Sequence, residues 1–193
     1  MNPGLVLTHG AGANSNAPLL IAVDEAFRAA SYRVARIDMA FRQRRPFGPP
    51  SPATAAQDRE SLREAVARMR ELVDGPVVLG GHSYGGRQAT MLAAEAPEVA
   101  DALLLLSYPL HPPDRPDKPR THHFPALRTP SLFVQGAKDP FGTIEEMRAA
   151  LHMIPARKEL LALDGLGHDL ARGHFDVAQL PRLLAALQPE HHA

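Results

Sequence analysis

The sequence has 193 residues, 45% hydrophobic and 22% charged, which fits one globular domain and excludes disordered, collagen-like and coiled-coil proteins. Its 21 Lys and Arg residues balance its 21 Asp and Glu residues, so the basic excess typical of nucleic-acid binders is missing and no nucleic-acid partner is expected. The complete lack of cysteine excludes disulfides, thiol nucleophiles and cysteine-ligated zinc.

The first apolar run, residues 4–8, is the length of a strand and lacks the positively charged segment that begins a signal peptide. No stretch of the sequence approaches the roughly 18 uncharged apolar residues that a membrane helix needs. The sequence therefore predicts a cytoplasmic protein without a membrane partner. Because no linker or repeat divides the chain, residues 1–193 are expected to form a single domain.

Short apolar runs alternate with helical patterns along the whole chain. This alternation is typical of parallel strands that crossover helices bury on both faces. It predicts an α/β fold with six mostly parallel strands and helices on both faces of the sheet. The predicted strands are residues 4–8, 33–38, 76–80, 102–107, 131–135 and 159–163.

Apolar residues at helical spacing predict the crossover helices between these strands. Thr143 followed by Glu146 is a capping-box pair and predicts the start of a later helix. Pro181 is expected in the first turn of the last helix, where its missing N–H costs nothing. The apolar positions of the three other helical patterns are Leu19, Leu20, Val23 and Phe27; Leu62, Val66, Met69 and Val73; and Leu180, Leu183, Leu184 and Leu187.

Two long proline-rich connections, residues 40–52 and 108–130, leave the carboxyl ends of predicted strands, where ligands bind in α/β sheets. The second contains seven prolines, which predict a mostly extended loop. Long ordered loops of this kind are often functional, and the alternative is a surface connection stiffened by proline.

The clearest chemical motif is Gly81-His82-Ser83-Tyr84-Gly85, which follows a predicted strand and precedes a helical pattern. A strand, G-x-S-x-G and a helix together form a nucleophile elbow, in which small residues let a strained serine present its hydroxyl at the edge of the sheet. The sequence therefore predicts that Ser83 is a nucleophile. The alternative is a glycine-rich turn with an incidental serine.

A nucleophile of this type needs an acid and a base, in the chain order serine, acid, histidine. Asp139 follows the fifth predicted strand and His168 follows the sixth, so both are expected at the edge where Ser83 lies. We predict Asp139 as the acid and His168 as the base. The competing candidates are Asp164, Asp169 and His174.

Attack on a carbonyl also needs two backbone N–H groups that stabilise the developing oxyanion. One is expected from Tyr84, directly after the nucleophile and at the positive end of the following helix. The other is expected from Ala11, in the small-residue turn that follows the first strand. Gly10 and Gly12 stay open as alternatives for this second donor.

The chain resembles an α/β-hydrolase in His9-Gly10, in the motif around Ser83, in Gly136-Ala137-Lys138-Asp139 and in Gly167-His168. More narrowly, it resembles the small KANL/Tex-type branch, which is itself similar to dienelactone-hydrolase-like proteins. The segments that carry this narrower resemblance are residues 108–110, 132–136 and 139–142.

The resemblance spans nearly the whole chain and implies a compact hydrolase fold with nucleophile Ser83, acid Asp139 and base His168, acting without a cofactor. Dienelactone hydrolases proper use a cysteine nucleophile, which this chain lacks. Full-size relatives carry a lid domain where this chain has only its second proline-rich connection. The resemblance therefore implies no lid domain, an open site and a small ester or thioester as substrate.

These features predict a serine hydrolase of the carboxylesterase or thioesterase type. The same branch includes subunits of a chromatin-associated complex, so the alternative is a non-catalytic protein-interaction module. The complete set of catalytic residue types favours the enzyme. A neutral chain with an α/β sheet is compatible with a monomer or a dimer.

Smaller features receive structural interpretations. The arginines of the first long connection are expected to form a solvated basic turn, and the alternative is that they attract a substrate carboxylate or phosphate. These arginines are Arg42, Arg44 and Arg45.

The aromatic residues in the loops are expected to pin those loops to the core rather than line an acyl pocket. They are Phe41, Phe47 and Phe141. No metal is expected at the surface or loop histidines of the second connection, which are His111, His122 and His123.

Overall fold

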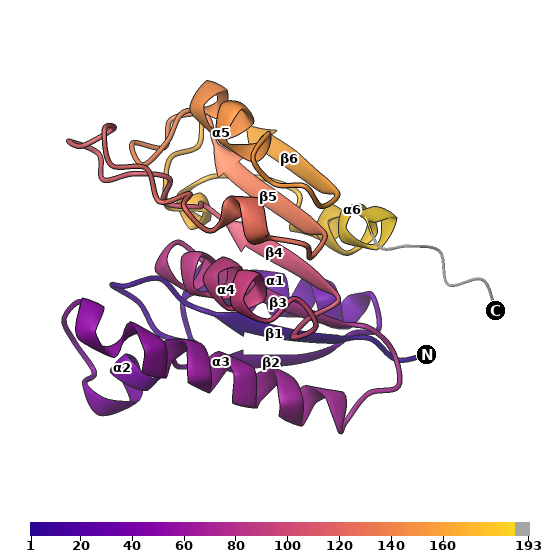
Figure 1. The fold of residues 1–193 in the computed structure, drawn as a ribbon. Helices are drawn as coiled ribbons and strands as arrows, with labels where there is room; N and C mark the ends of the chain where they lie inside the picture. Colours follow the sequence, from indigo (N-terminus) through magenta and orange to yellow (C-terminus); the bar gives the residue numbers. More distant parts are fainter. Residues whose placement is uncertain (188–193) are drawn as a thin grey trace.

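A six-stranded, wholly parallel sheet lies at the centre of the computed structural model, which describes residues 1–187 (Figure 1). The strand order is β2-β1-β3-β4-β5-β6, so the chain starts near the middle of the sheet and builds outward in both directions. The predicted α/β fold is confirmed. The strands are β1 (Gly4–Thr8), β2 (Arg33–Ile37), β3 (Val77–His82), β4 (Ala102–Leu106), β5 (Ser131–Gly136) and β6 (Lys158–Leu163).

Helices cover both faces of the sheet, which explains why its strands are continuous apolar runs. One face packs against α3 (Ala55–Arg70), α4 (Tyr84–Glu95) and α5 (Ile144–Leu151), and the other against α1 (Pro18–Ala29) and α6 (Leu180–Leu187) (Figure 1). Successive strand residues point to opposite faces. In β1, Val6 belongs to the first core, whereas Leu5 and Leu7 belong to the second.

Local signals in the sequence account for the starts of two helices. Thr143 caps α5 with a complete capping box, in which its hydroxyl accepts from the Glu146 amide and the Glu146 carboxylate accepts from the Thr143 amide. Pro181 occupies the first turn of α6, as predicted. Val73 was predicted on the helix that contains Leu62, but α3 ends at Arg70 and Val73 packs against the same core from the following turn.

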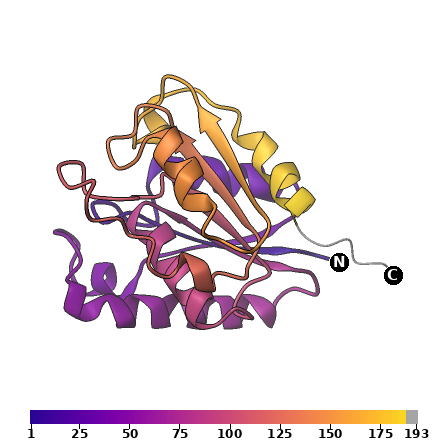
Figure 2. The same cartoon turned by 45° about the horizontal axis from the view of Figure 1, so that its top comes forward.

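The connecting segments that follow the strands gather at one end of the molecule, opposite the N-terminus (Figures 1 and 2). The first long connection begins with a short helix, α2 (Ala40–Arg44), which the sequence analysis did not predict. The second is largely irregular, with one 3-10 turn at Phe124–Ala126, in agreement with its prolines. Over residues 1–187, none of the helices is long and apolar enough to span a membrane.

Candidate active site

Ser83 lies in a sharp turn between β3 and α4, with φ 50° and ψ −115°. This left-handed φ is strained for a residue with a side chain, and it directs the hydroxyl away from the sheet. Glycine is required on both sides. A Cβ on Gly81 would come within 2.4 Å of the Gly85 carbonyl carbon, and a Cβ on Gly85 would come within 2.6 Å of the His9 oxygen.

The three residues that were predicted as nucleophile, base and acid are joined by two hydrogen bonds. The His168 Nε2 atom lies 2.8 Å from Ser83 Oγ, and His168 Nδ1 lies 2.8 Å from Asp139 Oδ2. With its proton on Nδ1, the imidazole donates to the carboxylate and leaves Nε2 free to accept from the serine hydroxyl. The imidazole is partly exposed, whereas Asp139 is 3% exposed, so solvent reaches the base but hardly reaches the acid.

The competing candidates do not join this arrangement. Asp169 lies beside His168, but its carboxylate accepts from the Ala171 amide and pairs with Arg172 at 3.1 Å. Neither Asp164 nor His174 forms a side-chain hydrogen bond with Ser83 or His168.

The loops that carry the acid and the base are fastened to each other because β5 and β6 are neighbours in the sheet. The Ala137 amide donates to the Leu163 carbonyl at 2.9 Å, and the Lys138 amide donates to the Leu166 carbonyl at 2.7 Å. Gly136 makes this approach possible. A Cβ at that position would lie 2.5 Å from the carbonyl oxygens of both Leu166 and Gly167.

Replacing Gly136 with alanine is therefore expected to push the His168 loop away from Asp139 and to lower kcat on an activated ester about 100-fold, because catalytic groups tolerate little displacement. Gly167→Ala is the matched control, since a Cβ there meets only the Lys138 oxygen, at 3.7 Å. Steady-state kinetics on both variants measures the effect. Equal activity of the two variants would contradict this role of Gly136.

Gln135 supports the acid and was missed by the sequence analysis. It is fully buried at the end of β5, and its Nε2 donates to Asp139 Oδ2 at 2.9 Å. The Phe141 amide donates to the other oxygen, Asp139 Oδ1, at 2.8 Å. Every close partner of this carboxylate is a hydrogen-bond donor, so both of its oxygens are held in a fixed orientation. The sequence feature that could have identified Gln135 was a single amide side chain at the end of an otherwise apolar strand.

His82 and Phe141 hold the base from two further directions. His82 Nε2 lies 3.2 Å from the His168 carbonyl oxygen, and burial lowers the pKa of His82, so its neutral ring donates to this carbonyl. The Phe141 ring lies 4.3 Å from the His168 ring, centroid to centroid. The first contact fixes the backbone of His168, and the second restricts the orientation of its imidazole.

The two predicted oxyanion donors lie in the turns that follow β1 and β3. Among residues 1–187, the amides of Ala11 and Tyr84 donate to no backbone carbonyl, so both are free to bind a ligand oxygen. His9 supports the first turn from the core. Its Nδ1 donates to the Gly10 carbonyl at 2.8 Å and its Nε2 accepts from the Met39 amide at 3.3 Å. Burial lowers the pKa of His9, which keeps this tautomer neutral.

Arg42 does not belong to a solvated turn, and that expectation was wrong. Arg42 is 6% exposed and donates to the carbonyls of Ala11 and Ala13, both at 2.8 Å, and of Gly48 at 3.2 Å. It therefore ties the Ala11 turn to the first long connection. The exposed side chains of Arg44 and Arg45 bind the Gln57 side chain and the Pro49 carbonyl.

The ring of Tyr84 is fixed by a buried acid. Its hydroxyl donates to Asp58 Oδ2 at 2.8 Å, and the Phe41 amide donates to Asp58 Oδ1, also at 2.8 Å. Burial, followed by the bond to Asp58, raises the pKa of Tyr84. The buried Phe41 ring meets the Tyr84 ring edge-on, so it pins α2 as expected, whereas Phe47 is 83% exposed and pins nothing.

Ser83 and His168 open into a cavity of about 460 Å³. Its lining is mostly apolar and includes Phe141, whereas the sequence analysis favoured a loop-pinning role over a pocket role for this residue. The remaining lining residues are Gly10, Ala11, Gly12, Ala13, Ala17, Pro18, Leu19, His82, Asp169 and Ala171.

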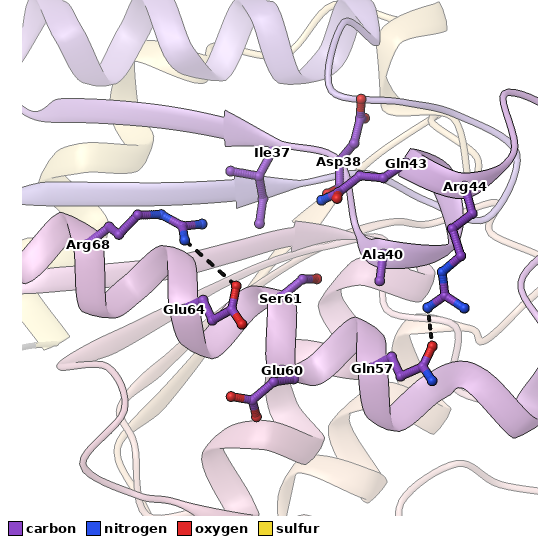
Figure 3. A pocket seen from close by; sticks show the side chains of 10 residues that line it. All are labelled: Ile37, Asp38, Ala40, Gln43, Arg44, Gln57, Glu60, Ser61, Glu64 and Arg68. Atoms are coloured by element: carbon purple, nitrogen blue, oxygen red, sulfur yellow. Dashed lines mark hydrogen bonds and ion pairs between the residues drawn. The ribbon is translucent and has the colours of Figure 1, made fainter.

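A larger cavity, of about 670 Å³, lies between α2 and α3 beside the end of β2 (Figure 3). Its walls carry the Arg68–Glu64 ion pair and the Arg44–Gln57 hydrogen bond. Its one serine, Ser61, donates to a carbonyl in its own helix, and no histidine lines the cavity. The residues predicted as nucleophile and base therefore line the smaller cavity and not this one.

Two of the three histidines of the second connection are engaged by protein groups, whereas His122 is exposed at the surface. His111 is buried and lies 3.3 Å from a Glu146 carboxylate oxygen, and His123 is buried and lies 2.8 Å from the Thr90 hydroxyl. Both are loop residues, as expected, but they are not at the surface. In the described part of the chain, no three metal-ligating side chains come together.

Comparisons with known proteins agree with this architecture. A family model described as "Alpha/beta hydrolase domain" matches residues 2–186. No curated protein matches the sequence.

Solved structures share the fold at low sequence identity. An alpha-beta serine hydrolase homologue from Coxiella burnetii is 16% identical, with a TM-score of 0.73 over 96% of this chain and 85% of that chain. Est1E from Butyrivibrio proteoclasticus is 17% identical, with a TM-score of 0.70 over 96% and 85%. Dienelactone hydrolase from Anabaena variabilis is 21% identical, with a TM-score of 0.66 over 96% and 81%.

Proposed function

The chain belongs to the α/β-hydrolase family, and from this premise we propose that it is a serine hydrolase that cleaves small esters or thioesters through an acyl-enzyme. The observation that carries the proposal is the continuous hydrogen-bonded series from Ser83 through His168 to Asp139. This hydrogen-bonded series, together with the strained backbone at Ser83, favours an enzyme over a non-catalytic interaction module.

In the first half of the reaction, Ser83 Oγ attacks the carbonyl carbon while its proton passes to His168 Nε2. The carbonyl oxygen becomes an oxyanion, and the amides of Ala11 and Tyr84 donate to it. Asp139 keeps the proton of His168 on Nδ1 and stabilises the imidazolium. When the tetrahedral intermediate collapses, the bond to the alcohol or thiol breaks and the imidazolium gives that leaving group its proton.

In the second half, His168 removes a proton from water, and the resulting hydroxide attacks the acyl carbon of the ester on Ser83. Collapse of the second intermediate releases the carboxylic acid and returns the proton to Ser83 Oγ. The chain supplies every group that these steps need. The cavity of about 460 Å³ beside Ser83 fits a small acyl group, and the proline-rich connection that stands in place of a lid domain supports open access.

Labelling with a fluorophosphonate probe, followed by intact-mass and peptide-mapping analysis, tests the proposal. We expect one adduct per chain, on Ser83. Ser107 and Ser31 are internal controls, because they have positive φ values of 50° and 67° without a histidine bonded to their hydroxyls. An unlabelled folded protein, or labelling of the control serines instead of Ser83, would contradict the assignment. Activity on ester and thioester libraries then identifies the substrate class.

A further inference from the structure

Besides the cavity at Ser83, a second cavity adjoins the same turn. It has a volume of about 500 Å³ and begins at Tyr84, the residue after the proposed nucleophile. Residues 50–53, 55 and 56 form one wall, Arg59 of α3 contributes to another, and α4 supplies Arg87, Gln88 and Met91. The first turns of α3 and α4 lie at the same end of the molecule as the strand ends (Figure 1). The Ser83–Tyr84 turn therefore faces two cavities, one that contains the Ser83 hydroxyl and one that contains the Tyr84 ring.

The second cavity contains a guanidinium without a counter-ion. Arg87 forms no ion pair and donates no side-chain hydrogen bond within residues 1–187, and its Nε atom is buried without a partner. Arg59 is only partly satisfied by protein groups, with Glu95 at 3.2 Å and Gln88 Oε1 at 3.1 Å. A buried charged donor without a partner is costly, so such an atom indicates a missing acceptor.

The surroundings of Arg87 are electropositive. Burial lowers the pKa of His123 to about 4, and the positive charges of His122, Arg87 and Arg59 act in the same direction. Burial also lowers the pKa of Arg120, again with the charge of Arg87 adding to the effect. An anion placed in this cavity would therefore meet the two guanidinium groups that line it, those of Arg59 and Arg87.

The nearby acids are already engaged. Asp58 is fully buried, and its two oxygens accept from the Tyr84 hydroxyl and the Phe41 amide. Glu95 pairs with Arg59. Neither acid lines the cavity, and within residues 1–187 neither forms an ion pair with Arg87.

We propose that this cavity binds an anionic group, a carboxylate or a phosphate, on the substrate, with Arg87 as its principal ligand and Arg59 beside it. The inference rests on the proposed function and names its substrate class: esters or thioesters with a negative charge a short distance from the scissile carbonyl. Arg87 lies one helical turn beyond Ser83, about 6 Å along the helix axis. A guanidinium can bind either anion through two parallel hydrogen bonds.

The test compares kcat/KM for aryl half-esters of succinate, glutarate and adipate with kcat/KM for neutral aryl esters of equal chain length. The ratio of the two values isolates recognition of the charge, because a general loss of activity cancels. The wild type is expected to favour the anionic series. Arg87→Gln is expected to lower the ratio about 10- to 100-fold, the effect of losing a hydrogen bond to a charged group. Arg87→Lys is expected to restore part of it.

Arg182→Gln is the matched control, because it removes the same charge from an exposed position on α6 and should leave the ratio at the wild-type value. A wild type that prefers the neutral series, or an unchanged ratio in folded Arg87→Gln, would overturn the proposal. If Arg87→Gln does not fold, the wild-type ratio is measured against ionic strength instead. A ratio that falls with added salt supports the site, and a constant ratio overturns it.

Inorganic phosphate and glutarate distinguish the two anion sources when each is titrated into Ser83→Ala protein by calorimetry. The anion that binds more tightly identifies the source, provided that the additional change Arg87→Gln weakens its binding. If neither anion binds, the proposed site is overturned. This experiment needs no turnover. A wild type without esterase activity whose Ser83→Ala variant binds an anion through Arg87 would contradict the proposed hydrolase but support the anion site.

Discussion

Replacement of Ser83 by alanine is expected to lower kcat on an activated ester about 10⁴- to 10⁶-fold, because no other hydroxyl is bonded to His168 Nε2. The change removes one oxygen atom and keeps the Cβ. The strain at φ 50° therefore stays the same, and the melting temperature should move little. Residual hydrolysis would come from the oxyanion donors and from binding alone.

Ser107→Ala is the matched control for this substitution. Ser107 is also a buried serine with a φ of 50°, but its hydroxyl has no hydrogen-bond partner. Removing a buried hydroxyl without a partner costs little stability, and the activity should stay near the wild-type value. Steady-state kinetics beside thermal unfolding separates catalysis from folding in both variants. Comparable turnover by Ser83→Ala and the wild type would refute the assignment of the nucleophile.

Asp139→Asn is expected to lower kcat about 10³- to 10⁴-fold. The reason is that an asparagine amide cannot accept hydrogen bonds from all three donors that surround the Asp139 carboxylate. His168 Nδ1 and Gln135 Nε2 both donate to Oδ2, and the Phe141 amide donates to Oδ1. Whichever way the new amide turns, its NH₂ group faces at least one buried donor. If NH₂ faces His168, the imidazole takes the other tautomer and Nε2 no longer accepts the serine proton.

The same donor conflict is expected to reduce the free energy of unfolding by about 1–3 kcal/mol. Asp164→Asn, at an exposed acid near His168, makes the same chemical change outside the hydrogen-bonded series and should leave both kcat and stability unaltered. Kinetics and chemical denaturation of the two variants test this prediction. If both lose activity equally, Asp139 is not the acid that orients His168.

The sequence could predict the elements that depend on local patterns. The predicted apolar runs all became strands, with ends that moved by at most two residues. These runs are residues 4–8, 33–38, 76–80, 102–107, 131–135 and 159–163. The capping box at Thr143 and the proline in the first turn of α6 also follow from short-range chemistry. The short helix α2 has no such signal, because it is held by the tertiary bond from the Phe41 amide to Asp58.

Residues that support the candidate site were less predictable because their contacts join distant segments. Arg42 reads as one cation in a basic loop, and only the fold brings the carbonyls of Ala11 and Ala13 to its guanidinium. In the sequence, Gln135 is only a polar residue at the end of a strand. Its role depends on the turn after β5, which brings the Asp139 carboxylate within hydrogen-bond distance of its amide. Sequence order and residue type indicated which groups could react, whereas the groups that orient them emerged only from the packed structure.

The position of β6 links the proposed chemistry to the local stability of the sheet. This strand is one of the two edge strands of the sheet and pairs only with β5, yet His168 lies in the loop that follows it, whereas Ser83 follows the central strand β3. Outer strands can open with less free energy than global unfolding requires. A transient opening that frees β6 would carry the base away while five strands and the nucleophile stay in place. Inactivation would then precede global denaturation, as a reversible local event at one side of the molecule.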